Sequence, residues 1–312
     1  MSSFQPAKVA KPETSENDPR FGNLISTGSS PKIRLCGFCS DNGVARNNGR
    51  IGAAAAPDEI RKYLYKLTPD PGQIKRFSSI MANVSDEGNL DANALPLDQA
   101  QEKLGNWVSD CLEQKQIPVI LGGGHETAFG HFSGYIKSQK KVQILNWDAH
   151  ADVRPLKENK PHSGSPFRQA LEHSGGFCEK YVVAGLQRHS LSAAHYEYLQ
   201  KQNCEWYFSG EVSKLLIERI YGRFTGDVMV TMDMDVLDQS VAPGVSAPAT
   251  NGLSLDLWLH AAFCAGANPK VLSLDISEMN PEFDRDGQTA RVAALTIWHF
   301  LKGLLRRPVA EK

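Results

Sequence analysis

The chain has 312 residues, of which 41% are hydrophobic and 22% are charged, so it can bury a large core in one or two domains. This composition excludes collagen-like, disordered and membrane-spanning classes. The formal net charge is -1 and the isoelectric point is about 6.8, so we find no basic footprint for nucleic acid or for an anionic membrane. We therefore expect a small-molecule partner.

The N-terminal residues 1–31 are rich in Ser, Pro, Lys and Glu and show no hydrophobic period, which predicts a flexible N-terminal extension. They resemble neither a secretory nor an organelle-targeting segment, so we expect a cytoplasmic protein. The six cysteines lie in apolar or mixed segments, as is typical of core thiols in a reducing compartment. Cys36 and Cys39 form a C-x-x-C that lacks the second pair of a zinc site, and we interpret both as structural.

Short β-rich runs alternate with longer helical patterns from Lys32 onward. The expected strands are IRLCGF at 33, PVILGG at 118, VQILNWD at 142, YVVAG at 181, EWYF at 205, DVMVTMDMD at 227 and VLSLDIS at 271. The expected helices cover residues 57–67, 97–116, 126–137, 192–201, 254–265 and 288–305. Several strands are near-continuous apolar runs, which favours a parallel sheet covered on both faces. We therefore predict a single α/β domain, residues 32–312, with helices on both faces of the sheet.

Acidic and imidazole side chains follow four of these runs, and ligands of parallel sheets bind where the strands end. These residues are His125, Asp148, His150, Asp152, Asp233, Asp235 and Glu278. Alternate residues of an extended segment face one way, so the side chains of D-A-H-A-D and D-M-D can converge. Carboxylates and imidazoles without thiolate favour a hard or borderline divalent ion such as manganese. A single short motif is more often a turn or a helix cap, but their combination predicts a metal centre.

These segments resemble the ureohydrolase family, which includes arginase and agmatinase. The resemblance covers nearly everything from Lys32 onward, including LGGGHETAFGH, LNWDAHADVR, SGSPFRQA, TMDMDVLD, APGVSAPATNGLS and LDISEMNPEFD. It implies an arginase-like three-layer sandwich with a mainly parallel eight-stranded sheet. It also implies two Mn²⁺ ions per subunit at the carboxyl edge of that sheet.

The family's ligand set can be carried over by position. One ion would be held by His125, Asp148, Asp152 and Asp233, and the other by Asp148, His150, Asp233 and Asp235. Asp148 and Asp233 would bridge the pair, and two such ions lower the pKa of a bridging water so that hydroxide can act as the nucleophile. The resemblance also implies that Asp152 passes a proton to the departing amine, and that Glu278 binds the cationic end of the substrate.

Three positions depart from arginase and point to one branch of the family. Gly124 stands where arginases have Asp, Arg154 stands where they have Asn, and Ser163 replaces a histidine proton shuttle, with His162 one residue earlier. These departures resemble the formimidoylglutamases, which hydrolyse N-formimino-L-glutamate to glutamate and formamide in histidine degradation. A guanidinium pairs well with a carboxylate, so we expect Arg154 to bind a carboxylate of this substrate. Ser163 is a further candidate substrate-binding residue. A structural ion pair between Arg154 and a loop carboxylate is the competing interpretation.

Other functions remain open at this stage. A guanidino-acid hydrolase, an agmatinase or an arginase would release urea instead of formamide, and a silent homologue would bind without turnover. The complete set of expected ligands argues against the silent homologue. His162 either replaces the missing shuttle or is not needed, and we favour the second interpretation because a shift by one loop position re-aims a side chain. The sequence is also compatible with a homo-oligomer.

Overall fold

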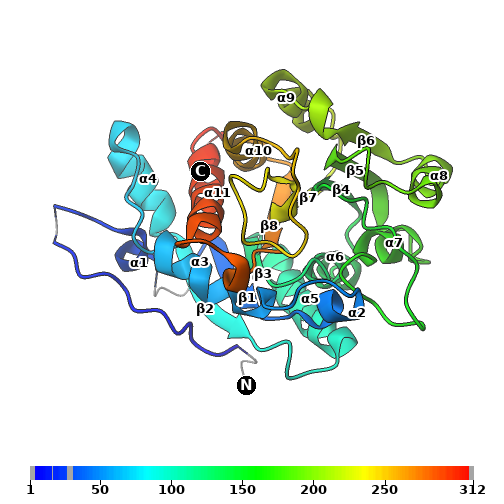
Figure 1. Ribbon diagram of the computed structural model, residues 1–312. Coiled ribbons are helices and arrows are strands. Elements are labelled where there is room, and N and C mark those ends of the chain that lie inside the picture. Colours follow the sequence, from blue (N-terminus) through cyan, green and yellow to red (C-terminus); the bar gives the residue numbers. More distant parts are fainter. Residues whose placement is uncertain (1–3, 16, 27–30, 309–312) are drawn as a thin grey trace.

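The computed structural model describes residues 4–15, 17–26 and 31–308. Within these residues, eight strands form one parallel sheet in the order β2-β1-β3-β8-β7-β4-β5-β6 (Figure 1). The strands are β1 (Ile33–Phe38), β2 (Val84–Leu90), β3 (Ile117–Gly122), β4 (Val142–Trp147), β5 (Cys178–Leu186), β6 (Glu205–Phe208), β7 (Val228–Asp233) and β8 (Val271–Ser277). The parallel eight-stranded sheet predicted from the sequence is confirmed.

Helices cover both faces of the sheet. They are α1 (Phe21–Leu24), α2 (Asn42–Arg46), α3 (Ala56–Leu64), α4 (Ile74–Met81), α5 (Leu97–Glu113), α6 (Thr127–Lys137), α7 (Pro166–Leu171), α8 (Ala193–Lys201), α9 (Lys214–Gly222), α10 (Leu255–Ala267) and α11 (Gln288–Leu304). Helices α5, α6 and α7 share one hydrophobic core, and α3, α9, α10 and α11 share the other (Figure 1). The molecule therefore has the three layers expected from the sequence. None of the helices in the described residues is long and apolar enough to cross a membrane.

Strands β4 and β7 are buried at every position, and β3 and β8 at every position but one, as their apolar runs predicted. In β4, Leu145 and Trp147 belong to the core under α10 and α11, whereas Ile144 belongs to the core under α5 and α6. Each fully buried side chain of this kind contributes about 1.5–3 kcal/mol of transfer free energy. The strands that precede the candidate ligands are therefore packed against a hydrophobic core on each face.

The sequence analysis did not find β2, because its sequence VSDEGNL is largely polar. This strand lies at the sheet edge and pairs only with β1 among the described strands. Its Asp86 forms an ion pair of 2.8 Å with Arg61 of α3, and both side chains are almost fully buried. Helices α1, α2, α4, α7 and α9 were also not predicted. Shortness alone does not explain this, because α3 and α8 have nine residues each and were predicted.

The flexible extension predicted for residues 1–31 needs a correction where the structure describes it. Phe21 is fully buried, and its N–H donates to the carbonyl of Leu67 over 2.8 Å. The Phe21 ring also stacks on Tyr65, while Gln5 pairs with Asn89 at the sheet edge. A few apolar residues in a polar segment are enough to dock it on the domain, and composition alone does not reveal this.

Candidate metal centre

The candidate ligands lie at the ends of four neighbouring strands, β3, β8, β7 and β4. One row of paired residues runs across these strands and consists of Leu121, Ile276, Met232 and Trp147. Asp148 and Asp233 each follow this row by one residue, so they lie side by side where β4 and β7 end. His125 follows β3 in the loop before α6, and Glu278 follows β8 directly.

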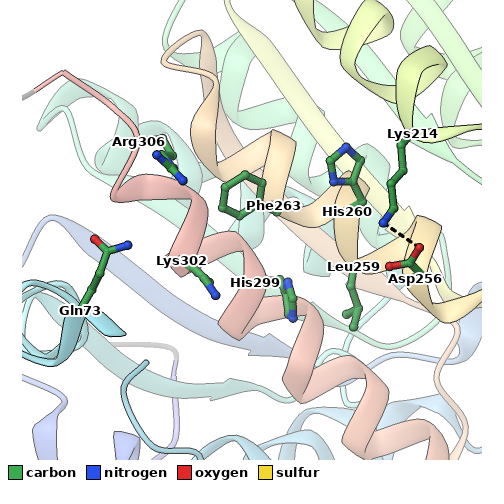
Figure 2. Close-up of a pocket in the computed structure, with 9 residues that line it drawn as sticks. All are labelled: Gln73, Lys214, Asp256, Leu259, His260, Phe263, His299, Lys302 and Arg306. Atoms are coloured by element: carbon green, nitrogen blue, oxygen red, sulfur yellow. Dashed lines mark ion pairs between the residues drawn. The ribbon is translucent and has the colours of Figure 1, made fainter. Parts of the chain in front are cut away.

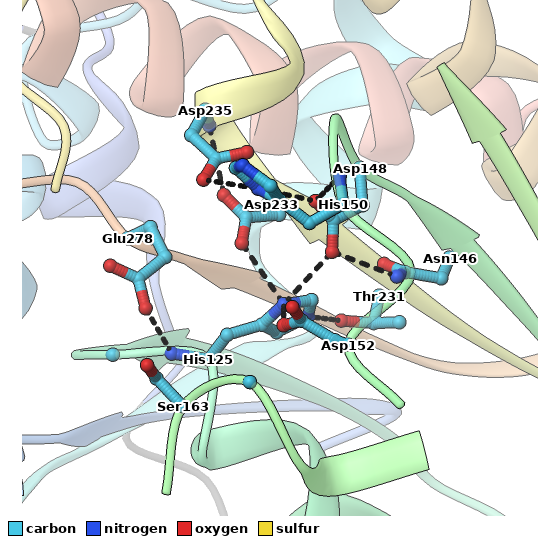
Figure 3. A network of polar contacts seen from close by, with 12 residues as sticks. His125, Asn146, Asp148, His150, Asp152, Ser163, Thr231, Asp233, Asp235 and Glu278 are labelled. Carbon is cyan, nitrogen blue, oxygen red and sulfur yellow. Dashed lines mark hydrogen bonds and ion pairs between the residues drawn. The ribbon is translucent and has the colours of Figure 1, made fainter. Parts of the chain in front are cut away.

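One group of ligands surrounds a single imidazole nitrogen (Figure 3). Nδ1 of His125 lies 3.3 Å from Asp148 Oδ2, 2.9 Å from Asp152 Oδ2 and 2.9 Å from Asp233 Oδ2. These four ligand atoms all lie within 4.8 Å of one another. A ring nitrogen carries at most one proton, which cannot satisfy three carboxylates at once. A divalent cation at this point can coordinate all four atoms.

A second group of ligands shares Asp148 with the first. Nδ1 of His150 lies 3.4 Å from Asp148 Oδ1 and 3.1 Å from Asp235 Oδ2, and these three residues form another potential ligand set. Asp148 thus turns one carboxylate oxygen to each group, which suits a residue that bridges two ions. Asp233 turns Oδ2 to the first group, while its Oδ1 accepts the Asp235 N–H over 2.8 Å. A bridging role for Asp233 therefore stays a prediction.

The charges of this cluster favour a bound cation. Burial, together with the charges of Asp235 and Asp148, raises the pKa of Asp233 well above its usual range. Burial opposes the ionised form of Asp148 as well, but its contacts with the two imidazoles lower its pKa on balance. Crowded buried carboxylates are costly unless a counter-charge is present. The donor set of carboxylates and imidazoles without a thiolate fits a hard or borderline divalent ion.

Glu278 stands beside the ligand groups in a strained backbone conformation, with φ at 64°. Its Oε1 accepts the His125 N–H over 2.6 Å, whereas its buried Oε2 has no hydrogen-bond partner among the described residues. Burial and the charge of Glu126 raise the pKa of Glu278 to about 8. Such an unpaired carboxylate oxygen is ready to accept an N–H group from a cationic ligand.

A cavity of about 430 Å³ opens beside the loop that follows Asp152. Three of its lining side chains, those of Arg46, Arg154 and Lys157, carry positive charges. Arg154 Nη1 donates to Asn47 Oδ1 over 3.2 Å, Lys157 Nζ donates to the Arg46 carbonyl over 3.0 Å, and Arg46 donates to the Pro161 carbonyl. In the part of the chain that the structure describes, these three cations form no ion pair with a carboxylate. The proposed loop ion pair of Arg154 is therefore not observed.

Two further residues of this loop were singled out in the sequence. Ser163 is buried, and its Oγ accepts a hydrogen bond of 3.1 Å from Asn47 Nδ2. His162 is buried too, with Nε2 placed 3.0 Å from the Pro155 carbonyl and Nδ1 accepting the Gly164 N–H over 3.1 Å. Burial lowers the pKa of His162, with a further contribution from the charge of Arg154. Since backbone groups occupy both ring nitrogens, His162 holds the loop in place.

Another cationic cavity, of about 330 Å³, lies along α10 and α11 (Figure 2). It shares no lining residue with the ligand groups. Its lysines are already neutralised, because Lys214 pairs with Asp256 over 2.8 Å and Lys302 pairs with Asp70 over 2.6 Å. The cavity beside Arg154 therefore offers the stronger attraction for an anion close to the metal centre.

The sequence analysis missed the polar residues that support the ligands from inside the strands. Asn146 Nδ2 donates to Asp148 Oδ2 over 3.0 Å, and Thr231 Oγ1 lies 2.9 Å from His125 Nε2. Thr231 is paired with Asn146 on one side and with Asp275 on the other. The sequence did contain a signal for such residues, namely a polar residue inside an otherwise apolar strand. A buried polar side chain without a hydrogen-bond partner is costly, so such a residue is expected to have a specific partner.

Glu126 links the metal-ligand loop to the cationic cavity. Its side chain is fully buried, and Oε1 accepts hydrogen bonds from Ser40 Oγ over 2.7 Å and from the Gly43 N–H over 2.8 Å. It thereby fixes the segment that continues into Arg46 and Asn47. The backbone at Gly123 can pack this closely against the backbone at Ser40 only because Gly123 has no side chain: an added Cβ would lie 1.8 Å from the Ser40 carbonyl oxygen.

Comparisons with known proteins agree with this geometry. The model of the arginase family matches residues 31–302 of the chain. The chain belongs to the arginase family. Two curated relatives, both named formimidoylglutamase, come from Rhodococcus opacus, at 36% identity over 83% of this chain and 81% of the relative, and from Lysinibacillus sphaericus, at 33% identity over 91% and 88%.

The solved structures add a likeness of fold. The crystal structure of Trypanosoma cruzi formiminoglutamase with Mn²⁺ superimposes with a TM-score of 0.86, at 31% identity over 93% of this chain and 100% of that one. The resemblance to the arginase family, the fold class and the assignment to a hydrolase family are thereby confirmed. The roles of the individual site residues stay predictions.

Proposed function

We propose that the chain is a two-manganese hydrolase that converts N-formimino-L-glutamate to L-glutamate and formamide in histidine degradation. The observation that carries this proposal is the position of the cationic cavity. It is lined by the loop that directly follows Asp152, one of the candidate metal ligands. A site of this kind suits a substrate with an amidine at one end and carboxylates at the other. The names of the relatives support the same substrate.

The metal ligands would be those carried over from the family. His125, Asp148, Asp152 and Asp233 would hold one manganese ion, and Asp148, His150, Asp233 and Asp235 would hold the other. When bound, the pair would supply a water molecule acidic enough to act as the nucleophile at neutral pH.

The protein's side chains would then place and protonate the substrate. Glu278 would accept N–H groups of the formimino cation through its unpaired oxygen, which turns the formimino carbon toward the ligand cluster. Hydrolysis adds water to that carbon and breaks its bond to the glutamate nitrogen. This nitrogen needs a proton to leave as an amine, and the Asp152 carboxylate would take the proton that the attacking water gives up and pass it to the nitrogen.

The glutamate part of the substrate would occupy the cationic cavity. Arg154 would pair with a carboxylate, and Ser163 would add a hydroxyl close to it. Arg46 and Lys157 extend the same positive field, and none of the three cations is paired with a carboxylate in the described structure. A pair of opposite unit charges at 4 Å gains about 1 kcal/mol in water and about 4 kcal/mol near a protein surface. Agmatine, which is a dication, would be repelled by the same charges.

The decisive experiment is a substrate panel for the purified manganese-loaded enzyme. Formiminoglutamate, arginine, agmatine and guanidinobutyrate are each incubated with the enzyme, and both formamide and urea are measured. We expect formamide from formiminoglutamate and little urea from the others. Urea from guanidinobutyrate as the main product would identify a guanidino-acid hydrolase, which the anionic tail of that substrate also allows. Tight manganese binding without any turnover would identify a binding protein.

We also propose a cytoplasmic location. All six cysteines carry free thiols in the structure, as is usual for proteins of a reducing compartment. Burial raises the pKa of Cys39 to about 12, so the thiol stays protonated and unreactive. Protein denatured in the presence of a thiol-blocking reagent, without reductant, should therefore carry six blocked thiols by mass spectrometry.

A further inference from the structure

The second ring nitrogen of the metal-ligand candidate His125 points away from the carboxylates and into a buried chain of hydrogen bonds. Its Nε2 lies 2.9 Å from Thr231 Oγ1 (Figure 3), and Thr231 Oγ1 donates to Asp275 Oδ1 over 2.7 Å. Thr231 and Asp275 are direct partners across β7 and β8, so they project from the same face of the sheet. All three side chains are almost fully buried.

The direction of these hydrogen bonds follows from what each group can donate. An ionised carboxylate only accepts, so the Thr231 hydroxyl proton must point to Asp275. The Thr231 oxygen is then left as an acceptor, and it can only accept from an Nε2–H of His125. With the proton held at Nε2, neutral His125 presents a bare Nδ1 to the three carboxylates, and a bare ring nitrogen is the form that binds a metal ion.

The last residue of this hydrogen-bond network lies on the helix that follows His125. Asp275 Oδ2 lies 2.6 Å from Nδ1 of His131, which is on α6, the helix that begins just after His125. Nε2 of His131 lies 2.6 Å from Ser273 Oγ, and Ser273 Oγ lies 2.6 Å from the Tyr135 hydroxyl. Burial raises the pKa of Tyr135, so this phenol keeps its proton and can donate it to Ser273.

We propose that Thr231, Asp275 and His131 form a positioning circuit that fixes the tautomer of His125 and thereby strengthens binding of the ion that His125 would hold. These residues touch neither that ion nor the substrate, so they act through His125 alone. The inference rests on the proposed function only in that a divalent ion binds there. Loss of such outer partners costs about 10- to 100-fold in metal affinity.

The first test compares variants at Thr231 by Mn²⁺ titration of the metal-free full chain, with free Mn²⁺ measured by electron paramagnetic resonance. Thr231→Val keeps the shape and removes the hydroxyl, so one of the two ions should bind about 10- to 100-fold more weakly while the other is unchanged. Thr231→Ser keeps the hydroxyl and should bind both ions within about threefold of the wild type. Equal affinities in Thr231→Val and the wild type would overturn the proposal, as would an equal loss in Thr231→Ser.

A matched control separates this effect from a general loss of stability. Thr296 is also fully buried, and its Oγ1 accepts from Trp258 Nε1 over 2.6 Å and donates to the Val292 carbonyl over 2.8 Å, in the other core. Thr296→Val should lower the melting temperature of the metal-free chain without weakening either ion. A similar loss of Mn²⁺ affinity in this variant would show that Thr231→Val acts through stability.

The second test asks whether His131 acts through Thr231. His131→Leu should weaken the same ion, and the double variant with Thr231→Val should be no weaker than Thr231→Val alone, because both changes break one circuit. Fully additive losses would show independent structural roles and refute the circuit. If wild-type protein binds no Mn²⁺, both this inference and the proposed function fail. If it binds two ions and the variants bind them equally well, only the circuit fails.

Discussion

The most informative perturbation is Arg154→Gln, which removes one charge from the cationic cavity and keeps a polar side chain. Arg154 is exposed at the cavity rim, and its observed partner is the neutral Asn47 amide, so the guanidinium is free to pair with a carboxylate. A hydrogen bond to a charged group is worth about 1.5–3 kcal/mol, and exposure favours the lower value. About 1.4 kcal/mol corresponds to tenfold, so kcat/KM for formiminoglutamate should fall by at least about tenfold.

The assay needs controls for charge, geometry and fold. Lys160→Gln removes the same charge from the same loop, but Lys160 does not line the cavity, so its activity should stay within about twofold. Arg154→Lys keeps the charge and loses the planar fork of the guanidinium, so it should recover only part of the activity. Manganese content should be unchanged in all three variants.

A formamidine without carboxylates separates recognition of the carboxylate from bracing of the loop. The Arg154 backbone already holds the loop, because its N–H donates to the Gly164 carbonyl over 2.8 Å. Arg154→Gln should therefore reduce turnover of formiminoglutamate far more than turnover of the formamidine. Equal losses on the two substrates, accompanied by a lower melting temperature, would refute the carboxylate role and remove the main physical reason for this substrate.

Three further predictions concern the metals, the thiols and proton transfer. Asp148→Asn or Asp233→Asn should abolish turnover and reduce manganese content, and a variant with two ions and normal turnover would exclude that residue from the site. Cys36→Ser and Cys39→Ser should leave both quantities unchanged, so a large loss in a folded variant would show that the C-x-x-C has another role. His162→Ala should lose less than the roughly 100-fold expected for a general acid or base, and a larger drop in kcat at constant metal content would reinstate it as a shuttle.

The cluster of candidate metal ligands could be predicted from the sequence because strand ends are easy to find in a parallel sheet. The runs before Asp148 and Asp233 are apolar except for Gln143 and Asn146 in one and Thr231 in the other. Both aspartates come directly after the row formed by Trp147 and Met232. Carboxyl ends of parallel strands meet at one edge, so acids at those ends had to come together. The assignment of individual oxygens to individual ions depends on side-chain angles, which the sequence does not specify.

The edge strand β2 shows where reasoning from apolar runs fails. An edge strand is not buried on both sides, so it tolerates polar residues such as Asp86. What secures β2 is a buried ion pair with Arg61, which lies 25 positions away in the chain. A pair of this kind has no periodic signal, and neither partner is unusual for its own segment.

The cationic cavity was only partly predictable for a similar reason. Arg154 stood out because it follows the metal motif by two residues. Arg46 lies in α2, and the loop around Lys157 is brought to it only in the folded chain, where Lys157 Nζ donates to the Arg46 carbonyl. Likewise, the pairing of Thr231 with Asp275 depends on the register of β7 against β8, which becomes visible only once the strand order is known.

The candidate metal ligands and the cations of the cavity lie on different kinds of structure. The candidate metal ligands lie at or just after the ends of buried central strands, and Asn146 and Thr231 hold two of them by hydrogen bonds from within the sheet. The cations that would bind the substrate tail lie on loops and on the short helix α2. Glu126, together with the Gly124 N–H that donates to the Ser40 carbonyl over 2.8 Å, ties the α2 segment to the loop that carries His125. Loops accept substitution more readily than buried strands. The preferred tail of the substrate can therefore change through Arg46, Arg154 or Lys157 while the hydrolytic centre stays intact.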